Sequence, residues 1–386
     1  MKSCMQYSNH LKSILIVGDL FPTCQNVSYF SKGDIETLFG KEIVQKFSEA
    51  YFSICNLEGA LTDHPDKCKK TGPVKLAPTD AVEAYRKLGI NYCLLANNHA
   101  TDGGHRGMLD TMQTLDNAGI KYIGAGKSEN DIVHFFVKEV GGLRVGFYNV
   151  SERMYNKPTE TQAGAWLYDE YIVCRELAQL KEECDYLIVL YHGGIEKFPY
   201  PSPENKKRFH RMADSGADMI IAQHTHCVGC EEYYNSSYLL YGQGDFLLNN
   251  FAAGLTDSGL IIELDIEDGQ VHIQKHLVKS VDNMYVRYAE QQDLSDFYAR
   301  SEKVNDDAFV FRLFQKFCDN ELKLYLTAFK SPSKLRLRQR KFFPRAYKKW
   351  LFRYNERDLL FALHSLRSEQ NRETAVVGIE HQLGIS

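Results

Sequence analysis

Short apolar runs of strand length alternate with amphipathic segments of helical period, and this alternation limits the folds open to the chain. Each run is followed by polar loop residues, as expected of strands buried on both faces. Several of the amphipathic segments end at a glycine, which is typical of a helix C-terminus. The pattern predicts a layered α/β domain. We expect strands at residues 14–17, 52–55, 92–95, 145–148, 187–190 and 219–221, and helices at 81–88, 108–118, 171–182 and 205–215.

The later part of the chain changes character. Two of its apolar runs are joined through Asp268-Gly269, a hairpin signal, and from about Ser295 the pattern becomes helical. We therefore expect an α/β domain over residues 13–285 and a helical C-terminal region over residues 290–386. The strands of this later part are expected at residues 238–241, 259–266 and 271–277.

Polar side chains follow directly, or nearly so, on the predicted strands of the first part of the chain. If the strands are parallel, these side chains converge on one edge of the sheet, where ligands of α/β proteins bind. Carboxylate, amide and imidazole groups together suit a pair of hard to borderline divalent metal ions. The candidate ligands are Asp19, Glu58, Asn98, His99, His192, His224 and His226.

Each of these residues also has an ordinary structural interpretation. An aspartate at a strand end, such as Asp19, often forms a helix-capping turn, and Glu58 reads equally as a solvated loop acid. A single histidine after a strand, such as His192, is usually packed or at the surface. His224 and His226 carry a stronger signal, because an extended His-x-His sequence places both imidazoles on one face. The joint occurrence favours a metal site, because otherwise every ordinary interpretation would have to hold at once.

The order and spacing of these residues form a recognisable set of motifs. The set comprises Gly18-Asp19, Asn56-Leu57-Glu58-Gly59, Asn97-Asn98-His99-Ala100 with Asp102, His192-Gly193-Gly194-Ile195-Glu196, and His224-Thr225-His226. It resembles the CapA family of poly-γ-glutamate and capsule biosynthesis proteins, in the metallophosphoesterase-like superfamily. The similarity covers about residues 14–255, including the stretch Tyr241-Gly242-Gln243-Gly244-Asp245-Phe246.

The resemblance implies a four-layer α-β-β-α metallophosphatase-like sandwich with a di-metal centre at the strand ends. The cofactor would be one or two divalent metal ions, and manganese, iron and zinc all suit the mixed oxygen and imidazole ligands. On this template the first ion is held by Asp19 and His226, the second by Asn98, His192 and His224, and both by Glu58.

The resemblance also implies roles for residues around the metal ions. His99, hydrogen-bonded in the relatives to an acidic neighbour such as Asp102, would be the general acid or would stabilise the transition state. Glu196, from the resemblance, and Lys75, from its local charge, are the candidate substrate-binding residues. An exposed loop lysine is the ordinary interpretation of Lys75.

Three residues depart from the family pattern. Phe21 stands where other metallophosphoesterases have a histidine, so the first metal site would lose an imidazole. Gln223 precedes His224 where glycine is common, and Asp245 replaces a customary asparagine. These departures bear on the number of metal ions and on turnover rather than on the fold.

We expect a metal-dependent hydrolase in capsule or anionic exopolymer biosynthesis. Its substrate would be an anionic polymer or a phosphoester, cleaved at a phosphoester bond or a γ-glutamyl amide. The alternative is a non-catalytic accessory or polymer-binding protein, in which the missing histidine at position 21 marks lost chemistry. The retained inward-facing polar groups favour the enzyme, because burying such groups is costly unless they have partners.

Charge is uneven along the chain, although its formal net charge of -4 gives no overall attraction to nucleic acid or to a membrane surface. Residues 330–353 contain many Lys and Arg with interleaved aromatics and no Asp or Glu. This basic-aromatic segment is suited to an anionic membrane surface or a capsule-synthase partner. The alternative is a helical segment whose aromatics pack on the main domain. No motif indicates a specific nucleic-acid partner.

The ten cysteines are scattered singly along the chain. The nearest pair, Cys227 and Cys230, is not matched by a second pair at zinc-binding spacing, and we interpret both as buried thiols. Ten reduced cysteines predict a cytoplasmic protein, here with peripheral association at the inner membrane through residues 330–353. The N-terminal residues lack an apolar stretch of signal-peptide length.

Overall fold

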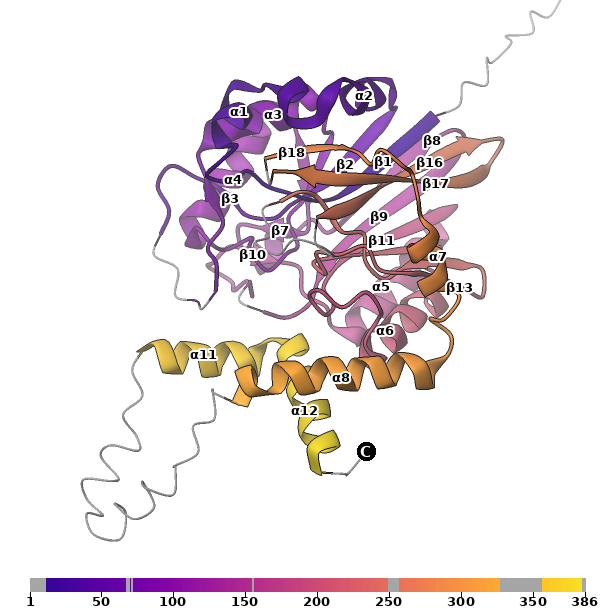
Figure 1. Ribbon diagram of the computed structural model, residues 1–386. Helices are drawn as coiled ribbons and strands as arrows, with labels where there is room; N and C mark the ends of the chain where they lie inside the picture. Colours follow the sequence, from indigo (N-terminus) through magenta and orange to yellow (C-terminus); the bar gives the residue numbers. More distant parts are fainter. Residues whose placement is uncertain are drawn as a thin grey trace, which may run out of the picture.

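Two large β-sheets face each other in the computed structural model, and helices cover the outer side of each (Figure 1). The structure describes residues 12–66, 70, 72–154, 156–248, 257–282, 284–326 and 356–383. The basic-aromatic segment expected at residues 330–353 lies outside the described residues.

The first sheet has eight strands in the order β18-β17-β16-β1-β2-β5-β6, with β15 also paired to β1. β1, β2, β5 and β6 are parallel, whereas β16, β17 and β18 form an antiparallel extension. The expected hairpin turn at Asp268-Gly269 joins β16 to β17. The strands are β1 (Lys12–Leu20), β2 (Phe52–Leu57), β5 (Tyr92–Leu94), β6 (Lys121–Ile123), β15 (Asp245–Leu247), β16 (Ser258–Glu267), β17 (Gln270–Val281) and β18 (Tyr285–Tyr288).

The second sheet has six strands in the order β13-β14-β12-β11-β9-β8. Its four central strands are parallel, and β8 and β13 pair antiparallel at the two edges. The strands are β8 (Phe135–Val140), β9 (Leu143–Ser151), β11 (Tyr186–His192), β12 (Met219–Gln223), β13 (Glu231–Tyr234) and β14 (Ser237–Leu240).

Helices α1 to α4 pack on the first sheet, and α5 and α6 pack on the second (Figure 1). Short elements in the connecting loops complete the domain. The helices are α1 (Val27–Lys32), α2 (Ile35–Glu49), α3 (Val82–Leu88), α4 (Gly104–Ala118), α5 (Glu170–Glu183) and α6 (Pro203–Asp214). The short elements are β3 (Ala60–Leu61), β4 (Leu76–Ala77), β7 (Ala125–Gly126), β10 (Gly164–Ala165) and the 3₁₀ turns Thr79–Ala81 and Glu129–Asp131.

The alternation of side chains along the strands explains the four layers. On β1, Ile14 and Ile16 pack between the two sheets with residues of the second sheet such as Ile188. Leu15 and Val17, which point to the opposite face, pack against the helices of the first outer layer. Successive strand residues point to opposite faces, so a strand buried on both sides is apolar throughout. The expected α-β-β-α sandwich is confirmed.

The described part of the C-terminal region is helical, as expected, and it packs on the outer helices of the second sheet. Phe314 and Cys318 of α8 belong to the same apolar core as Leu177 of α5. Arg208 of α6 forms an ion pair with Glu369 of α12 at 2.7 Å. Among the described residues, no helix combines the length and apolarity that crossing a membrane requires. The helices are α7 (Ser295–Ser301), α8 (Asp307–Leu326), α11 (Glu356–Arg367) and α12 (Glu369–Leu383).

Candidate metal centre

The predicted metal ligands and His99 lie together at the carboxyl ends of the parallel strands of both sheets. The first sheet supplies the residues at the ends of β1, β2 and β5, and the second supplies those at the ends of β11 and β12. The expectation of a single sheet edge is therefore corrected, because two facing sheets share the site. All seven side chains are buried: Asp19, Glu58, Asn98, His99, His192, His224 and His226.

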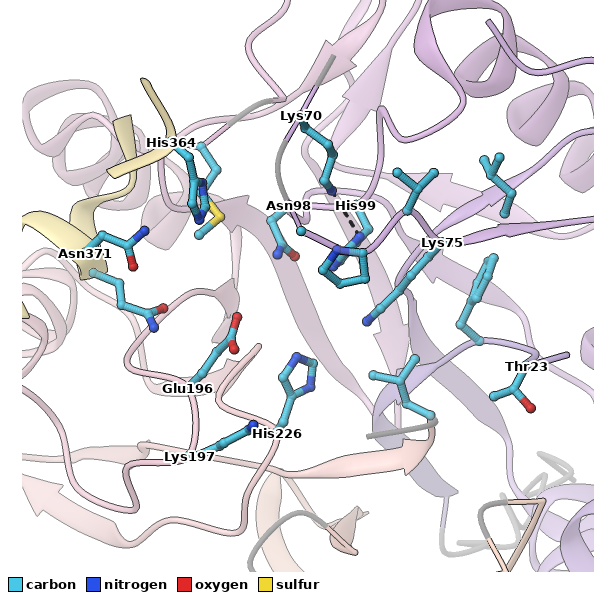
Figure 2. Close-up of a pocket in the computed structure, with 18 of the residues that line it drawn as sticks. Thr23, Lys70, Lys75, Asn98, His99, Glu196, Lys197, His226, His364 and Asn371 are labelled. Carbon is cyan, nitrogen blue, oxygen red and sulfur yellow. Dashed lines mark hydrogen bonds between the residues drawn. The ribbon is translucent and has the colours of Figure 1, made fainter. Parts of the chain in front are cut away.

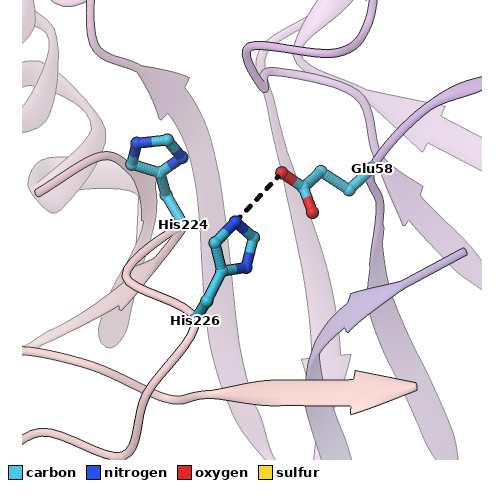
Figure 3. A group of neighbouring side chains, drawn as sticks. All are labelled: Glu58, His224 and His226. Carbon is cyan, nitrogen blue, oxygen red and sulfur yellow. Dashed lines mark ion pairs between the residues drawn. The ribbon is translucent and has the colours of Figure 1, made fainter. Parts of the chain in front are cut away.

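Glu58 lies at the centre of this group. Its Oε1 is 3.8 Å from the Nε2 atoms of three histidines, which are His99, His192 and His226. No hydrogen bond reaches Oε1, although the atom is buried. Its Oε2 accepts a hydrogen bond from Lys75 Nζ at 2.7 Å. Figure 3 shows Glu58 facing His226, with His224 beside them.

The distances around Glu58 fit a bound divalent cation. Two ligand atoms that each lie about 2.0–2.2 Å from one cation are separated by roughly 3.0–4.2 Å for angles between 90° and 180°. The separations of 3.8 Å from Glu58 Oε1 fall within this range. Ligand atoms of Glu58, His224 and His226 all lie within 4.8 Å of one another. The buried Nδ1 of His224 also lacks a hydrogen-bond partner. Such buried polar atoms without partners are rare in folded proteins, so the donor set fits a cation.

Asn98 and Asn56 position the His192 ring between the two sheets. The Oδ1 of Asn98 lies 2.9 Å from His192 Nε2, which places the amide oxygen beside the imidazole that faces Glu58. The Nδ2 of Asn56 lies 3.2 Å from His192 Nδ1. The ring therefore has a neighbour at each nitrogen, and such outer contacts set the orientation of metal-binding histidines.

A second group of ligand atoms, from Asp19, His226 and Asp245, also lies within 4.8 Å. β1 and β15 are parallel neighbours with Asp19 in register with Asp245, which brings the two carboxylates together. His226 Nδ1 is 2.9 Å from Asp245 Oδ1. Burial lowers the pKa of His226, but Asp245 and Glu58 outweigh it and raise the pKa to about 10. Asp245, noted in the sequence only as a departure from the family pattern, is thus part of the site.

His224 and His226 do not lie on an extended strand, and this part of the prediction is wrong. β12 ends at Gln223, and both histidines have positive φ angles, 86° and 53°. Their ring centroids are 5.8 Å apart. The two imidazoles still enter the same site, but they do so through a loop in the left-handed region. Non-glycine residues adopt this region rarely, and it is often found at functional sites.

His99 forms the expected pair with Asp102. Its Nδ1 lies 2.6 Å from Asp102 Oδ2, and Lys70 Nζ donates to Asp102 Oδ1 at 2.5 Å. The backbone N–H of Lys75 donates to the same carboxylate at 2.6 Å. Burial, together with the charges of Lys75 and Lys70, holds the pKa of His99 well below its usual value. The ring is therefore neutral at pH 7 in the metal-free protein, with Nε2 facing Glu58.

A cavity of about 860 Å³ opens in front of the centre. Figure 2 shows residues that line it. Its walls carry Lys70, Lys75 and Lys197 as well as Glu196. The predicted substrate residues both line it, but in different ways. The side chain of Glu196 is 40% exposed, and its Oε1 is 3.8 Å from His224 Nε2. That of Lys75 is only 15% exposed and is paired with Glu58, so Lys75 is not an exposed loop lysine.

Two parts of the site were missed in the sequence. Glu152, at the end of β9, is buried, and its Oε1 lies 3.8 Å from His224 Nε2. Burial raises the pKa of Glu152 to about 8. The rule used for the other strand ends would have found it, because it follows the predicted strand at residues 145–148. The second missed part is the C-terminal wall of the cavity, formed by His364 of α11 and by Gln370 and Asn371 of α12 (Figure 2). Gln370 Oε1 lies 3.3 Å from His224 Nε2. No pattern in the sequence indicated this wall.

Cys227 and Cys230 are buried and free, as expected. Burial raises the pKa of the Cys227 thiol to about 12. A thiol with a pKa this high stays protonated at neutral pH, whereas metal binding requires a thiolate. Neither cysteine belongs to a candidate metal-binding group among the described residues.

The chain is similar to a bacterial protein family and to several individual relatives. Residues 13–250 match the model of a family described as bacterial capsule synthesis protein PGA_cap. The PGA biosynthesis protein CapA of Bacillus subtilis is 27% identical over 201 residues, covering 51% of this chain and 50% of that protein. The capsule biosynthesis protein CapA of Bacillus anthracis is 27% identical over 191 residues, covering 48% and 46%. A probable polyglutamine synthesis accessory protein of Mycobacterium tuberculosis is 29% identical over 201 residues, covering 49% and 51%. The chain thus spans about half the length of these relatives.

Solved structures with similar folds share little sequence identity with the chain. A putative 5'-nucleotidase from Staphylococcus aureus is 14% identical with a TM-score of 0.46, covering 77% of this chain and 58% of that one. A phosphatase from Mycoplasma pneumoniae is 13% identical with a TM-score of 0.43, covering 71% and 96%.

Proposed function

The chain belongs to the bacterial capsule synthesis protein family PGA_cap, and from this we propose that it is a divalent-metal-dependent hydrolase of capsule or anionic exopolymer biosynthesis. It cleaves a phosphoester or a γ-glutamyl amide. The observation that carries the proposal is the buried Oε1 of Glu58, which has no hydrogen bond and has three imidazole nitrogens 3.8 Å away. A scaffold would gain nothing from such an arrangement, because burying polar atoms without partners destabilises a protein.

The candidate ligands are those expected of manganese, iron or zinc, namely a carboxylate, an amide oxygen and imidazoles. Glu58, Asn98, His192 and His224 would hold the cation, with His226 beside them. When bound, such an ion lowers the pKa of a water molecule and stabilises negative charge on the oxygens of the substrate.

His99 is positioned to move a proton during the reaction. Its Nδ1 is held by Asp102, so the Nε2 lone pair of the neutral ring faces the cavity. Nε2 accepts a proton from an attacking water and then donates it to the leaving group, the usual sequence for a histidine acting as base and then acid. Asp102 and Lys70 keep the ring in this orientation.

The charges lining the cavity suit an anionic substrate. Lys70 and Lys197 lie on its walls together with Lys75. Phe361, from α11, adds an apolar surface. The arrangement supports binding of an anionic polymer or a phosphoester, with Glu196 limiting how many negative groups can approach His224.

A non-catalytic accessory role is the second candidate. Phe21 replaces a metal-binding histidine of other metallophosphoesterases, and the mycobacterial relative is named an accessory protein. In this role the cavity binds the polymer or a biosynthetic partner without cleaving it.

Elemental analysis combined with a hydrolysis assay distinguishes the two candidates. Wild-type protein and the Asn98→Ala, His224→Ala double variant are purified, analysed for metals, and assayed with bis(p-nitrophenyl) phosphate and added Mn²⁺. Metal that is bound by the wild type only, with activity that follows the metal, supports a phosphoester hydrolase. Metal without this activity directs the assay to γ-glutamyl peptides. A wild type that binds no metal supports the accessory role.

Localisation is proposed from residues 330–353 alone. This basic segment would attract the protein to anionic lipid at the inner membrane. Vesicles containing anionic lipid should retain the protein at low salt and release it at high salt. Failure to bind at low salt would contradict the proposal.

A further inference from the structure

Lys75 binds one of the two carboxylate oxygens of Glu58. Its ammonium donates to Glu58 Oε2 at 2.7 Å, on the oxygen that does not face the three imidazoles. The side chain of Glu58 is fully buried and that of Lys75 nearly so. The two side chains therefore form a buried ion pair inside the site.

Protein donors already bind the carboxylates on the same side of the site. Asp19 Oδ1 accepts from Asn56 Nδ2 at 2.7 Å, and its Oδ2 accepts from the backbone N–H of His224 at 3.2 Å. Asp245 is bonded to His226 Nδ1 at 2.9 Å. A cation bound by Asp19 and Asp245 would have to share these oxygen atoms with the protein donors.

The position that a further imidazole would need is filled by an apolar ring. Phe21 is 2% exposed and packs in the core of the first sheet. A Cβ atom added to Gly59 would lie only 2.4 Å from Phe21 Cε2, which shows how tightly the ring covers the backbone next to Glu58. An aromatic hydrocarbon supplies no ligand, and it makes the first cation site less polar.

We propose that the centre binds one divalent cation, between Glu58 Oε1 and the imidazoles of His192, His224 and His226, and that the Lys75 ammonium takes the place of a second. This inference rests on the proposed metal-dependent function. The geometry assigns a different partner to each oxygen of Glu58. A second dication near Oε2 would be repelled by the ammonium, and Coulomb repulsion is strong at short range inside a protein.

The Lys75 ammonium can perform part of the role that a second metal ion would have. In two-metal hydrolases, the pair of ions holds the attacking and departing oxygens of the substrate. Lys75 lines the cavity, and an ammonium carries three N–H donors, so it can bind Glu58 and a substrate oxygen together. Lys75 is thus a substrate-positioning residue as well as the partner of Glu58.

Counting bound Mn²⁺ and recording its electron paramagnetic resonance spectrum tests the proposal. Wild-type protein, stripped with chelator and dialysed against saturating Mn²⁺, should hold one equivalent and give the signal of an isolated ion. The Phe21→His, Lys75→Ala variant should hold two equivalents and give the signal of a magnetically coupled pair. The control variant Lys197→Ala removes a different cation from the same cavity and should hold one equivalent.

If the double variant does not fold, the wild type alone still decides how many cations the centre binds. Two equivalents with a coupled signal in the wild type would overturn the one-cation centre while leaving the metal-dependent function in place. No bound Mn²⁺ would overturn both. One equivalent in the wild type that rises to two in the double variant supports the role of Lys75, whereas a folded double variant that still binds only one overturns that role.

Discussion

The two sheets contribute differently to one site. The first sheet supplies carboxylates that protein donors already bind: Asp19 is bonded to Asn56, and Glu58 to Lys75. The second sheet supplies imidazoles, together with buried atoms that lack partners, such as His224 Nδ1 and Glu152 Oε1. Where polar atoms lack protein partners, a ligand is expected to satisfy them. Affinity for a cation therefore depends mainly on the second sheet and on Glu58 and Asn98 of the first, whereas Asp19 of the first sheet balances charge.

The largest expected effect comes from removing an imidazole of the second sheet. His192→Ala should weaken Mn²⁺ binding by more than about 100-fold, because the loss of a ligand exceeds the cost of losing an outer contact. Asp19→Asn, the matched change in the first sheet, should weaken it by only about 10-fold. Titration of chelator-treated protein with Mn²⁺ measures both. Equal losses would show that the two sheets hold the cation equally.

A variant of His99 tests whether this residue of the first sheet transfers protons or binds the metal ion. His99→Ala should lower kcat for the phosphodiester by about 10²- to 10⁴-fold, the usual contribution of a general acid or base. Its metal content should equal that of the wild type, as measured by elemental analysis. Asp102→Asn should have a smaller effect, because the ring keeps its place but loses a charged partner. Loss of metal in His99→Ala would instead make His99 a ligand.

The ion pair between α6 and α12 tests how firmly the C-terminal wall is attached to the second sheet. Glu369→Ala leaves Arg208, whose side chain is 15% exposed, without its carboxylate partner. The free energy of unfolding, measured with urea, should fall by about 1–3 kcal/mol. The control Glu204→Ala removes an exposed carboxylate from α6, with 57% exposure, and should change it by less than about 0.5 kcal/mol. Equal effects would indicate a weakly held wall.

Glu152 should affect the pH dependence of stability in the metal-free protein. Burial raises its pKa from 4.5 to about 8, so between these values the folded state holds a proton that the unfolded state has lost. Stability therefore falls as pH rises through this window, by about 1 kcal/mol per pH unit. Glu152→Gln should lack this contribution, and urea unfolding at pH 5, 6 and 7 measures it. Parallel pH profiles for the two proteins would contradict the prediction.

The main strands and helices could be predicted because their apolar periodicity is local. All six apolar runs predicted as strands in the first part of the chain are strands in the structure, including residues 14–17 and 219–221. The helices α1 and α2 were not expected. Gly40, with a φ of 75°, interrupts α2, and this break disturbs the periodicity over residues 35–49.

The site could be predicted only where a polar residue follows a predicted strand. Asp19 and His192 were found in this way, and the family resemblance assigned their roles. The partner of Glu58 was not found, because Lys75 lies 17 positions away in a loop whose path is set by tertiary packing. Gln370 is 146 positions from His224, and no local pattern links two such distant segments. The left-handed backbone of His224 was also hidden, since side-chain chemistry does not reveal it.

The wall formed by α12 has a consequence for the order in which the protein is assembled. Every candidate metal ligand precedes residue 250, whereas Gln370 and Asn371 come after both sheets in the chain. Because a growing polypeptide folds from its N-terminal part as it leaves the ribosome, the sheets and their ligands can form first. A cation can then enter through a side that α12 later covers. Assembly of the ligands and completion of the cavity therefore belong to different stages in the synthesis of the chain.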